Sequence, residues 1–273
     1  MKRIGILTLA AMVLTACSSE NEEQRMENEE LSEVTLTFSP YNVSPMTRTV
    51  TSIAEVVNHL DVWLSDGTTT TDYHQQSGDS NFGFLSVTLD KTKTYTMYAV
   101  AHKADGATLS DGVISFTDDK VTHSMYYSTT FSPATTNSIS CLMQRIVADF
   151  RLDITDEIPT GAVKFRFTVS DVYDRWNVTT GATHGIDRVS TINYGGTSAI
   201  FNVYAITTDD QTTHDITVEA LDADEAVIQT RTFADVPLRN GYKTNYRGTF
   251  FIDTPMTMSF TVNDWNEYET VDF

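Results

Sequence analysis

The sequence predicts an all-β protein in which two successive antiparallel β-sandwich domains follow a signal segment and an acidic tether. Three observations predict this fold class. Apolar and polar residues alternate over many short runs, of which Val34 to Phe38 is the first. Turn dipeptides such as Asp66-Gly67 and Asn240-Gly241 separate these runs, and signals for long helices are sparse. Alternation with a period of two places one face on a core and the other in water, which is typical of sheets packed face to face.

The first segment of the chain resembles the signal peptide of a bacterial lipoprotein. Lys2 and Arg3 precede an apolar run from Ile4 to Leu14, which is too short to span a bilayer as a helix. Small residues then precede Cys17, as in a lipobox. We therefore expect residues 1–16 to be removed and Cys17 to carry a lipid that anchors the chain in the outer membrane. An ordinary signal peptide and a buried first strand are the alternatives.

Residues 17–33 are predicted to form an acidic tether. The segment is rich in glutamate and has almost no apolar residues. Such a segment buries too little apolar surface to offset the entropy lost on ordering, so a solvated spacer is expected. Ser18, Ser19 and the acidic residues after them also resemble the signal that sends some lipoproteins of Bacteroidetes to the outer face of the outer membrane.

The N-terminal β-sandwich domain is predicted over residues 34–136. Leu60 to Leu64 and Tyr95 to Ala101 continue the period-2 alternation. Ser52 to His59 carries a helical signal, a serine cap with a glutamate three residues later, and should form one or two turns. Residues 131–138, with a proline among Ser, Thr and Asn, indicate the domain boundary.

The C-terminal β-sandwich domain is predicted over residues 137–273. Ile146 to Ile154 and Val163 to Val169 alternate strongly between apolar and polar residues. The sequence shows no strong internal repeat. Two similar sandwiches are still compatible with it, because β-sandwiches tolerate wide sequence divergence.

Composition excludes one class of partner. The formal net charge is −19 at pH 7, and no basic run compensates for it. A chain this acidic repels the phosphate backbone of nucleic acids. We therefore expect no nucleic-acid binding.

The residues that usually carry chemistry do not form a known motif. The six histidines include no close metal-ligand pair, and there is no nucleophile elbow or phosphate loop. We therefore expect no catalytic residues, no metal, no cofactor and no enzymatic activity. Asp222, Asp224 and Glu225 lack the glycine and final glutamate of a calcium loop and should form a solvated hairpin turn. Cys141 is expected to be a small buried hydrophobe.

Several segments together carry a resemblance to a known family. These segments are Met46–Thr49, Asn81–Phe84, Tyr98–His102, Leu142–Ala148, Arg239–Gly248 and Val262–Trp265. Their order, after an acidic-tethered lipoprotein start, resembles the fimbrillin superfamily of Bacteroidetes pili. That superfamily contains stalk pilins, tip subunits and anchor or accessory subunits.

The resemblance implies two transthyretin-like sandwiches and assembly by strand exchange. In the family a trypsin-like protease cuts after an arginine behind the first strand. Here this implies that Val34 to Phe38 is a removable strand and that the chain is cut between Arg48 and Thr49. The lost strand opens a groove, which a strand of another subunit fills.

A donor-like strand lies near the C-terminus. Its alternating apolar residues are Met256, Met258, Phe260 and Val262. The same strand also fits as a part of its own sandwich, and Arg48 also fits as a solvated loop residue. Anchor subunits of the family keep their first strand and their lipid. The implied partners are other fimbrial subunits, the outer membrane through the lipid, and a host protein or glycan.

Two other functions compete with a fimbrial subunit that serves adhesion. The first is a monomeric glycan-binding surface lipoprotein. Its aromatic platform would come from Trp63, Tyr126, Tyr127, Trp176 and Trp265. The second is an envelope hydrolase with a pair of carboxylates, although nothing in the sequence singles out such a pair.

Overall fold

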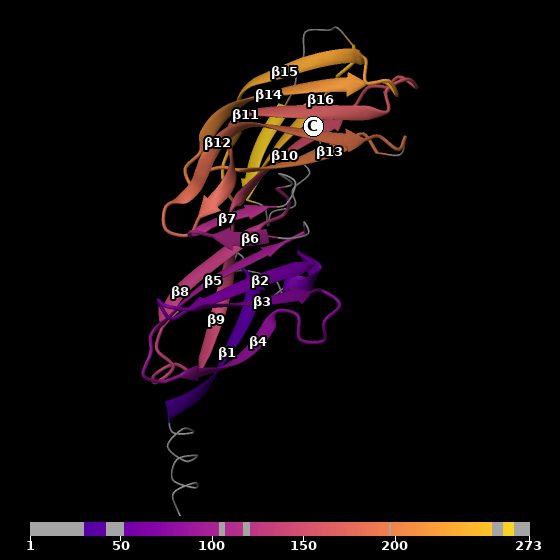
Figure 1. Cartoon of the computed structure of the whole chain (residues 1–273). Helices are drawn as coiled ribbons and strands as arrows, with labels where there is room; N and C mark the ends of the chain where they lie inside the picture. Colours follow the sequence, from indigo (N-terminus) through magenta and orange to yellow (C-terminus); the bar gives the residue numbers. More distant parts are fainter. Residues whose placement is uncertain are drawn as a thin grey trace, which may run out of the picture.

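The computed structural model describes residues 30–41, 52–103, 107–116, 121–196, 198–252 and 259–264. These residues form strands and a single short 3-10 helix, which confirms the all-β class (Figure 1). They contain no helix that is long and apolar enough to cross a membrane. Cys17 and the first part of the predicted tether lie outside the described residues. The first strand begins at Leu31, inside the segment predicted as tether.

The first sandwich consists of two sheets that enclose one hydrophobic core. Its elements are β1 (Leu31–Pro40), η1 (Ile53–Glu55), β2 (His59–Ser65), β3 (Thr70–Gln76), β4 (Phe84–Asp90), β5 (Tyr95–His102), β8 (Met125–Phe131) and β9 (Ser138–Arg145). One sheet has the order β4-β1-β9 and the other β3-β2-β5-β8. β8 and β9 join the two sheets through a short pairing at Gln144 and Arg145. Ser52 caps η1 and accepts from Ala54 N, as the sequence predicts.

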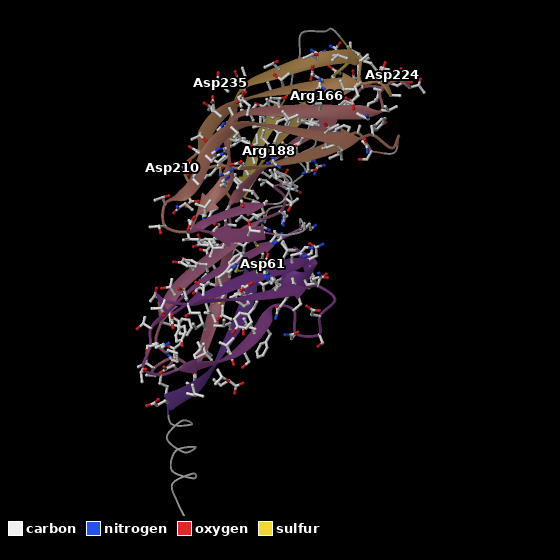
Figure 2. The ribbon with its side chains drawn as sticks, viewed as in Figure 1. Asp61, Arg166, Arg188, Asp210, Asp224 and Asp235 are labelled. Atoms are coloured by element: carbon white, nitrogen blue, oxygen red, sulfur yellow. The ribbon has the colours of Figure 1, made fainter. Side chains whose placement is uncertain are left out.

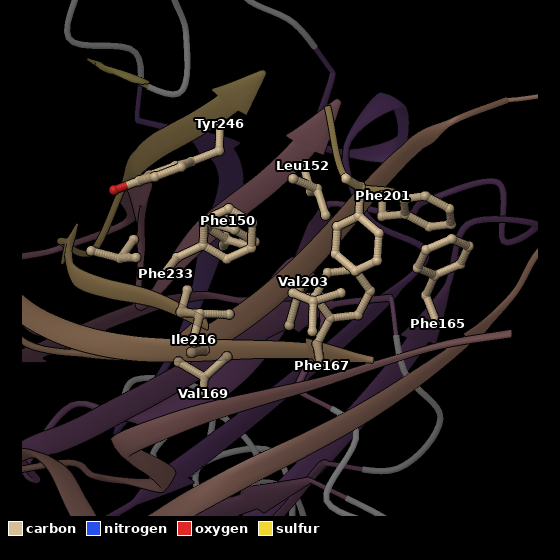
Figure 3. Packing of buried hydrophobic residues seen from close by; sticks show 14 of the residues in the cluster. Phe150, Leu152, Phe165, Phe167, Val169, Phe201, Val203, Ile216, Phe233 and Tyr246 are labelled. Carbon is tan, nitrogen blue, oxygen red and sulfur yellow. The ribbon is translucent and has the colours of Figure 1, made fainter. Parts of the chain in front are cut away.

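The second sandwich has the same two-sheet plan. Its strands are β10 (Val147–Ile154), β11 (Lys164–Asn177), β12 (Gly181–Asn193), β13 (Ile200–Ile206), β14 (Thr212–Leu221), β15 (Val227–Leu238), β16 (Tyr242–Gly248) and β17 (Ser259–Asp264). One sheet has the order β12-β11-β14-β15 and the other β13-β10-β16-β17. Figure 3 shows their aromatic core, in which Phe150 lies against Phe167 and Phe233.

A hairpin from the first half of the chain connects the two sandwiches. β6 (Ala107–Ser110) and β7 (Val113–Phe116) pair with each other, and β7 also pairs with β11 of the second sandwich. Figure 1 shows this hairpin between the two sandwiches. A third hydrophobic cluster forms beneath it, with Ile114 from the hairpin and Val147 and Ile206 from the second sandwich.

The chain passes from one sandwich to the other later than residue 137. β9 pairs with β1 and β8 of the first sandwich, and β10 is the first strand of the second. The change of sheet therefore falls at Ile146. Residues 131–138 run from the last residue of β8 to the first residue of β9 within one sandwich, which explains why a loop-rich composition resembled a linker.

The two sandwiches repeat one topology that the sequence does not reveal. In order, β1, β2, β3, β4, β5, β8 and β9 correspond to β10, β11, β12, β13, β14, β15 and β16. In each, the first strand runs antiparallel to the fourth and parallel to the last of these seven. All other strand pairs are antiparallel, as expected. Among the residues that the structure describes, the repeats differ in the β6–β7 hairpin, inserted in the first, and in β17, added to the second.

The first strand and its groove as the candidate functional site

β1 lies in the middle of its sheet. It pairs antiparallel with β4, where Leu36 is the partner of Leu85, and parallel with β9, where Leu36 is the partner of Ile139. Both edges of β1 are therefore hydrogen-bonded. Without β1, the facing edges of β4 and β9 would lose their backbone partners.

Side chains on alternate positions of β1 enter the core. Val34 and Leu36 are fully buried and Phe38 is 3% exposed, while Thr35 and Thr37 face outward. This burial confirms the period-2 pattern. Three such side chains contribute a gross stabilisation of about 5–9 kcal/mol at the usual value for each. The same strand thus completes both the sheet and the core.

Hydrogen bonds fasten β1 near both of its ends. Lys91 N donates to Glu30 O at 2.6 Å, and Tyr41 N donates to Met143 O at 2.8 Å. The Glu33 carboxylate also accepts from the Ser86 hydroxyl at 2.6 Å. The pairing therefore extends over the whole strand.

A glycine allows η1 to pack closely over the far end of β1. Gly83 has φ +84°, and a Cβ placed there would lie 2.7 Å from Ile53 Cγ2. Its carbonyl accepts from Phe38 N at 2.8 Å, and its N–H donates to Gln75 Oε1 at 3.0 Å. Gln75 is itself buried and donates to Phe84 O. Residues 42–51 connect this end of β1 to η1, and the predicted processing residues Arg48 and Thr49 lie among them, outside the described residues.

The wall of the groove on β9 is apolar and chemically inert. Cys141 and Met143 are fully buried, and Cys141 is the register partner of Phe38. Burial raises the pKa of the Cys141 thiol to about 12. The thiol is therefore protonated at neutral pH, and Cys141 is the small buried hydrophobe that the sequence predicts.

The predicted donor strand is paired within its own sandwich. β17 runs antiparallel to β16, with Phe260 opposite Tyr246 and Val262 opposite Thr244. Met256 and Met258 lie outside the described residues. The pairing realises the second of the two interpretations of this segment, and a donor role for it stays a prediction.

Of the aromatic residues expected to form a glycan platform, Trp63 is buried, and Tyr126, Tyr127 and Trp176 are half-buried and pack against hydrophobic clusters. Trp63 is 6% exposed and belongs to the cluster beneath the hairpin. Tyr126 and Trp176 contact each other in the same cluster at 5.8 Å between ring centres, and Tyr126 donates to Val178 O. Tyr127 packs against the first core. Trp265 lies outside the described residues.

The acidic run in the second half is a hairpin turn between β14 and β15. Asp222 Oδ1 accepts from Asp224 N at 2.9 Å and from Ala226 N at 2.8 Å. Glu225 adopts φ +65° and forms an ion pair with Lys164. Figure 2 shows Asp224 at one end of the second sandwich. Among the residues that the structure describes, no group of three side chains is arranged to hold a metal ion.

A polar cluster on the first sandwich, buried at Asp61 and His102 and exposed at His74, carries no local signal in the sequence. Asp61 accepts from His74 Nδ1 and from His102 Nε2, the latter at 2.6 Å. His102 is fully buried, stacks on His59 and contacts Phe116 edge-on. The hydrogen bond to Asp61 raises the pKa of His74. His59 and Asp61 lie on β2, His74 on β3 and His102 on β5, so the strand register brings these four side chains together. Figure 2 labels Asp61 on the first sandwich.

Comparison with known proteins relates the chain to solved structures from Bacteroides. No family model matches the sequence, and no curated protein does. A candidate adhesin from Bacteroides ovatus is 14% identical with a TM-score of 0.55, over 85% of this chain and 96% of its own. A candidate cell adhesion protein from Bacteroides uniformis is 16% identical with a TM-score of 0.53, over 85% and 99%.

A third structure carries a different description. Candidate polysaccharide-binding proteins from Bacteroides thetaiotaomicron are 10% identical with a TM-score of 0.54, over 86% of this chain and 96% of the other. At such low identities the likeness establishes the shared fold. It covers both sandwiches, since the aligned parts take in nearly all of each chain.

Proposed function

We propose that this chain is a non-enzymatic fimbrial subunit of the bacterial cell surface that serves adhesion. The observation that carries the proposal is the placement of β1. It is a continuous, core-filling strand, paired on both edges, and it ends just before the segment that contains Arg48. The solved structures described as adhesin and cell adhesion proteins share the fold and support the same class of function.

In the proposed mechanism the chain reaches the outer membrane as a lipoprotein anchored at Cys17. Hydrolysis of the peptide bond between Arg48 and Thr49 then separates β1 from the rest of the chain. Once β1 leaves, β4 and β9 present unpaired backbone groups above an open core, which is a template for strand addition. A strand of another subunit with alternating apolar residues, such as Met256 to Val262, restores both.

Strand replacement suits a contact that must last. The incoming strand regains the backbone hydrogen bonds of β1 and fills the space of Val34, Leu36 and Phe38. Because ordering the strand opposes part of the gross gain, the contact is stable only when side chains fill the groove well. In the proposed mechanism this chain therefore binds a strand, and a separate protease cleaves the peptide bond.

An arginine-specific protease tests the mechanism on the chain from residue 18 onward. We expect cutting after Arg48 to release β1 and to produce ladders on a gel that resist heating in detergent. The R48Q variant should give no ladder. R25Q is the matched control, because a cut at Arg25 leaves β1 attached, and this variant should polymerise like the unaltered chain.

Two outcomes would overturn the proposal. One is a chain cut after Arg48 that retains β1 and stays monomeric at every concentration. The other is tight sugar binding by the uncut monomer without any polymer, which would favour the glycan-binding alternative.

A further inference from the structure

The topological repeat reveals a strand position that is filled in one sandwich and open in the other. In the second sandwich, β17 extends the sheet by pairing along β16 from Tyr242 to Arg247. The counterpart of β16 in the first sandwich is β9. Within the described part of the chain, no strand pairs with residues 138–143 of β9 on the side away from β1. Figure 1 shows β9 and β17, the latter in yellow.

The backbone groups on this side of β9 follow from its pairing with β1. Thr35 N donates to Asn137 O, and Tyr41 N donates to Met143 O. In a parallel pair, alternate residues of a strand bond to the same neighbour. The N–H and C=O groups of Ser138, Ser140 and Leu142 therefore point away from β1. β8 takes up the edge only at Gln144 and Arg145.

This edge lacks the usual protection against pairing. Residues 138–143 include no charged residue and no proline, and Leu142 is 47% exposed. By contrast, the edge strand β15 carries Arg231, Pro237 and register irregularities. β4 is also uncharged before Asp90, but its counterpart β13 gains no added strand among the described residues. The repeat thus singles out β9.

We infer that the free edge of β9 binds the C-terminal strand of a second copy of this chain, Ser259 to Asp264, in antiparallel orientation. β17 already makes this contact with the equivalent strand of its own chain. Its register partners on β16 include the buried residues Thr244 and Tyr246, two positions apart. β9 presents Cys141 and Met143, also buried and two positions apart. The strand alternation of β17 therefore fits β9 as it fits β16.

The contact is distinct from the groove of β1. It leaves β1 in place and needs no cleavage, so it does not depend on the proposed function. Moving β17 from β16 to a neighbour's β9 exchanges one strand pairing for a similar one, so protein concentration decides between the two. Because each copy offers one strand and one edge, the association runs head to tail.

Cysteine cross-linking of the uncut chain tests the inference. In S140C/T261C the two thiols lie directly opposite each other between copies in one of the registers that keep this alternation, within reach of a disulfide. We expect oxidation to give dimers and longer ladders that increase with protein concentration. S259C or N263C in place of T261C covers registers shifted by two residues. N-terminal sequencing verifies that the cross-linked chains still contain β1.

Two matched variants serve as controls. T88C/T261C places the first cysteine on the other uncharged edge, β4, and should stay monomeric. N245C/T261C joins β16 to its own β17, because Asn245 and Thr261 are register partners. This locked chain should lose self-association in light scattering and regain it after reduction.

Three results would overturn the inference. In the first, S140C combined with T261C, S259C or N263C cross-links no more than T88C/T261C does. In the second, self-association persists in the locked chain, and in the third, the wild-type chain is monomeric at all concentrations. S140P gives an independent test, since it removes an N–H on the free side of β9, where proline is tolerated. It should abolish self-association while T88P should not. Unchanged circular dichroism verifies that both variants fold.

Discussion

The two sandwiches share one topology but hold their first strands differently. β1 is buried on one face only, and its outward side chains Thr35 and Thr37 reach solvent. β10 is buried on both faces from Val147 to Phe150, because the hairpin cluster covers its other side. It also carries Asp149, whose buried carboxylate accepts from Asn202 and pairs with Lys243. Removal of β10 would therefore break buried contacts on a second face, whereas the outer face of β1 contributes an exposed hydrogen bond between Glu33 and Ser86.

The chain connections of β1 and β10 differ in the same sense as their burial. β10 follows β9 after the single residue Ile146, so cutting the chain on either side of β10 would divide the two sandwiches. β1 is the first strand in the described part of the chain, and the segment 42–51 separates it from η1. Under the proposed mechanism, the repeated fold therefore contains one strand that is removed and an equivalent strand that stays in place.

The largest expected effect comes from matched truncations in the two first strands. Leu36 and Leu152 are both fully buried, so Leu36→Ala and Leu152→Ala should each destabilise the protein by about 2–5 kcal/mol. Denaturant unfolding measures both losses. After cleavage at Arg48, only Leu36→Ala should speed the release of β1. Equal acceleration by Leu152→Ala would contradict the difference between the strands.

A pair of glycines isolates the contact that closes over β1. Gly83 and Gly67 both have positive φ, so alanine costs about 1–2 kcal/mol of strain at either position. At Gly83 the added Cβ also meets Ile53, which costs about 1–3 kcal/mol more, whereas nothing lies within 4 Å at Gly67. Thermal denaturation should therefore rank Gly83→Ala below Gly67→Ala. Equal losses of thermal stability in the two variants would mean that η1 shifts to accommodate the added Cβ at no cost.

Acid should weaken the junction between the sandwiches. His123 lies edge-on to Tyr204, and burial lowers its pKa to about 3. Since the unfolded chain binds this proton near pH 6.5, the stabilisation present above that pH is lost as the pH falls toward 3, at about 1 kcal/mol per pH unit. Denaturation between pH 7 and 5 measures the slope, which His123→Gln should flatten. An unchanged slope would assign the acid sensitivity to other groups.

The smallest expected effect is a loss of stability with rising pH, opposite in sign to that of His123, and it comes from His74 in the first sandwich. The pKa of His74 is raised by its hydrogen bond to Asp61, so the stabilisation is complete below the unfolded pKa and is lost as pH rises through the folded value. His74 is largely exposed, so solvent screening limits the contribution to about 0.5 kcal/mol. Comparison of wild type with His74→Gln at pH 6 and pH 8 measures it. A larger effect at pH 8 would reverse the assignment.

Local alternation predicted the strands well, and long-range pairing explains what it missed. β1, β2, β5, β10 and β11 appear in the sequence because one face of each contacts a core. The expected polar face of β2 proved buried at Asp61 and Trp63, since the hairpin covers it. The transition between sandwiches at Ile146 and the partners of β9 depend on pairings across many residues, which local composition does not encode.

The features of the candidate site also separate into those that the local sequence predicts and those that depend on long-range pairing. Burial of β1 was predictable from its own residues, and the groove formed by β4 and β9 was not. The packing role of Gly83 could not be predicted from its own segment, because it depends on Ile53, distant in the sequence. Cys17, Arg48, Thr49, Met256 and Met258 lie outside the described residues, so their roles stay predictions.

Intact mass and N-terminal sequencing of the protein recovered from its own cell surface test the central claim most directly. We expect the heat-resistant, high-mass material to begin at Thr49, with β1 removed. A lipidated Cys17 terminus in every assembled chain would contradict the claim, because β1 would then still occupy the groove between β4 and β9.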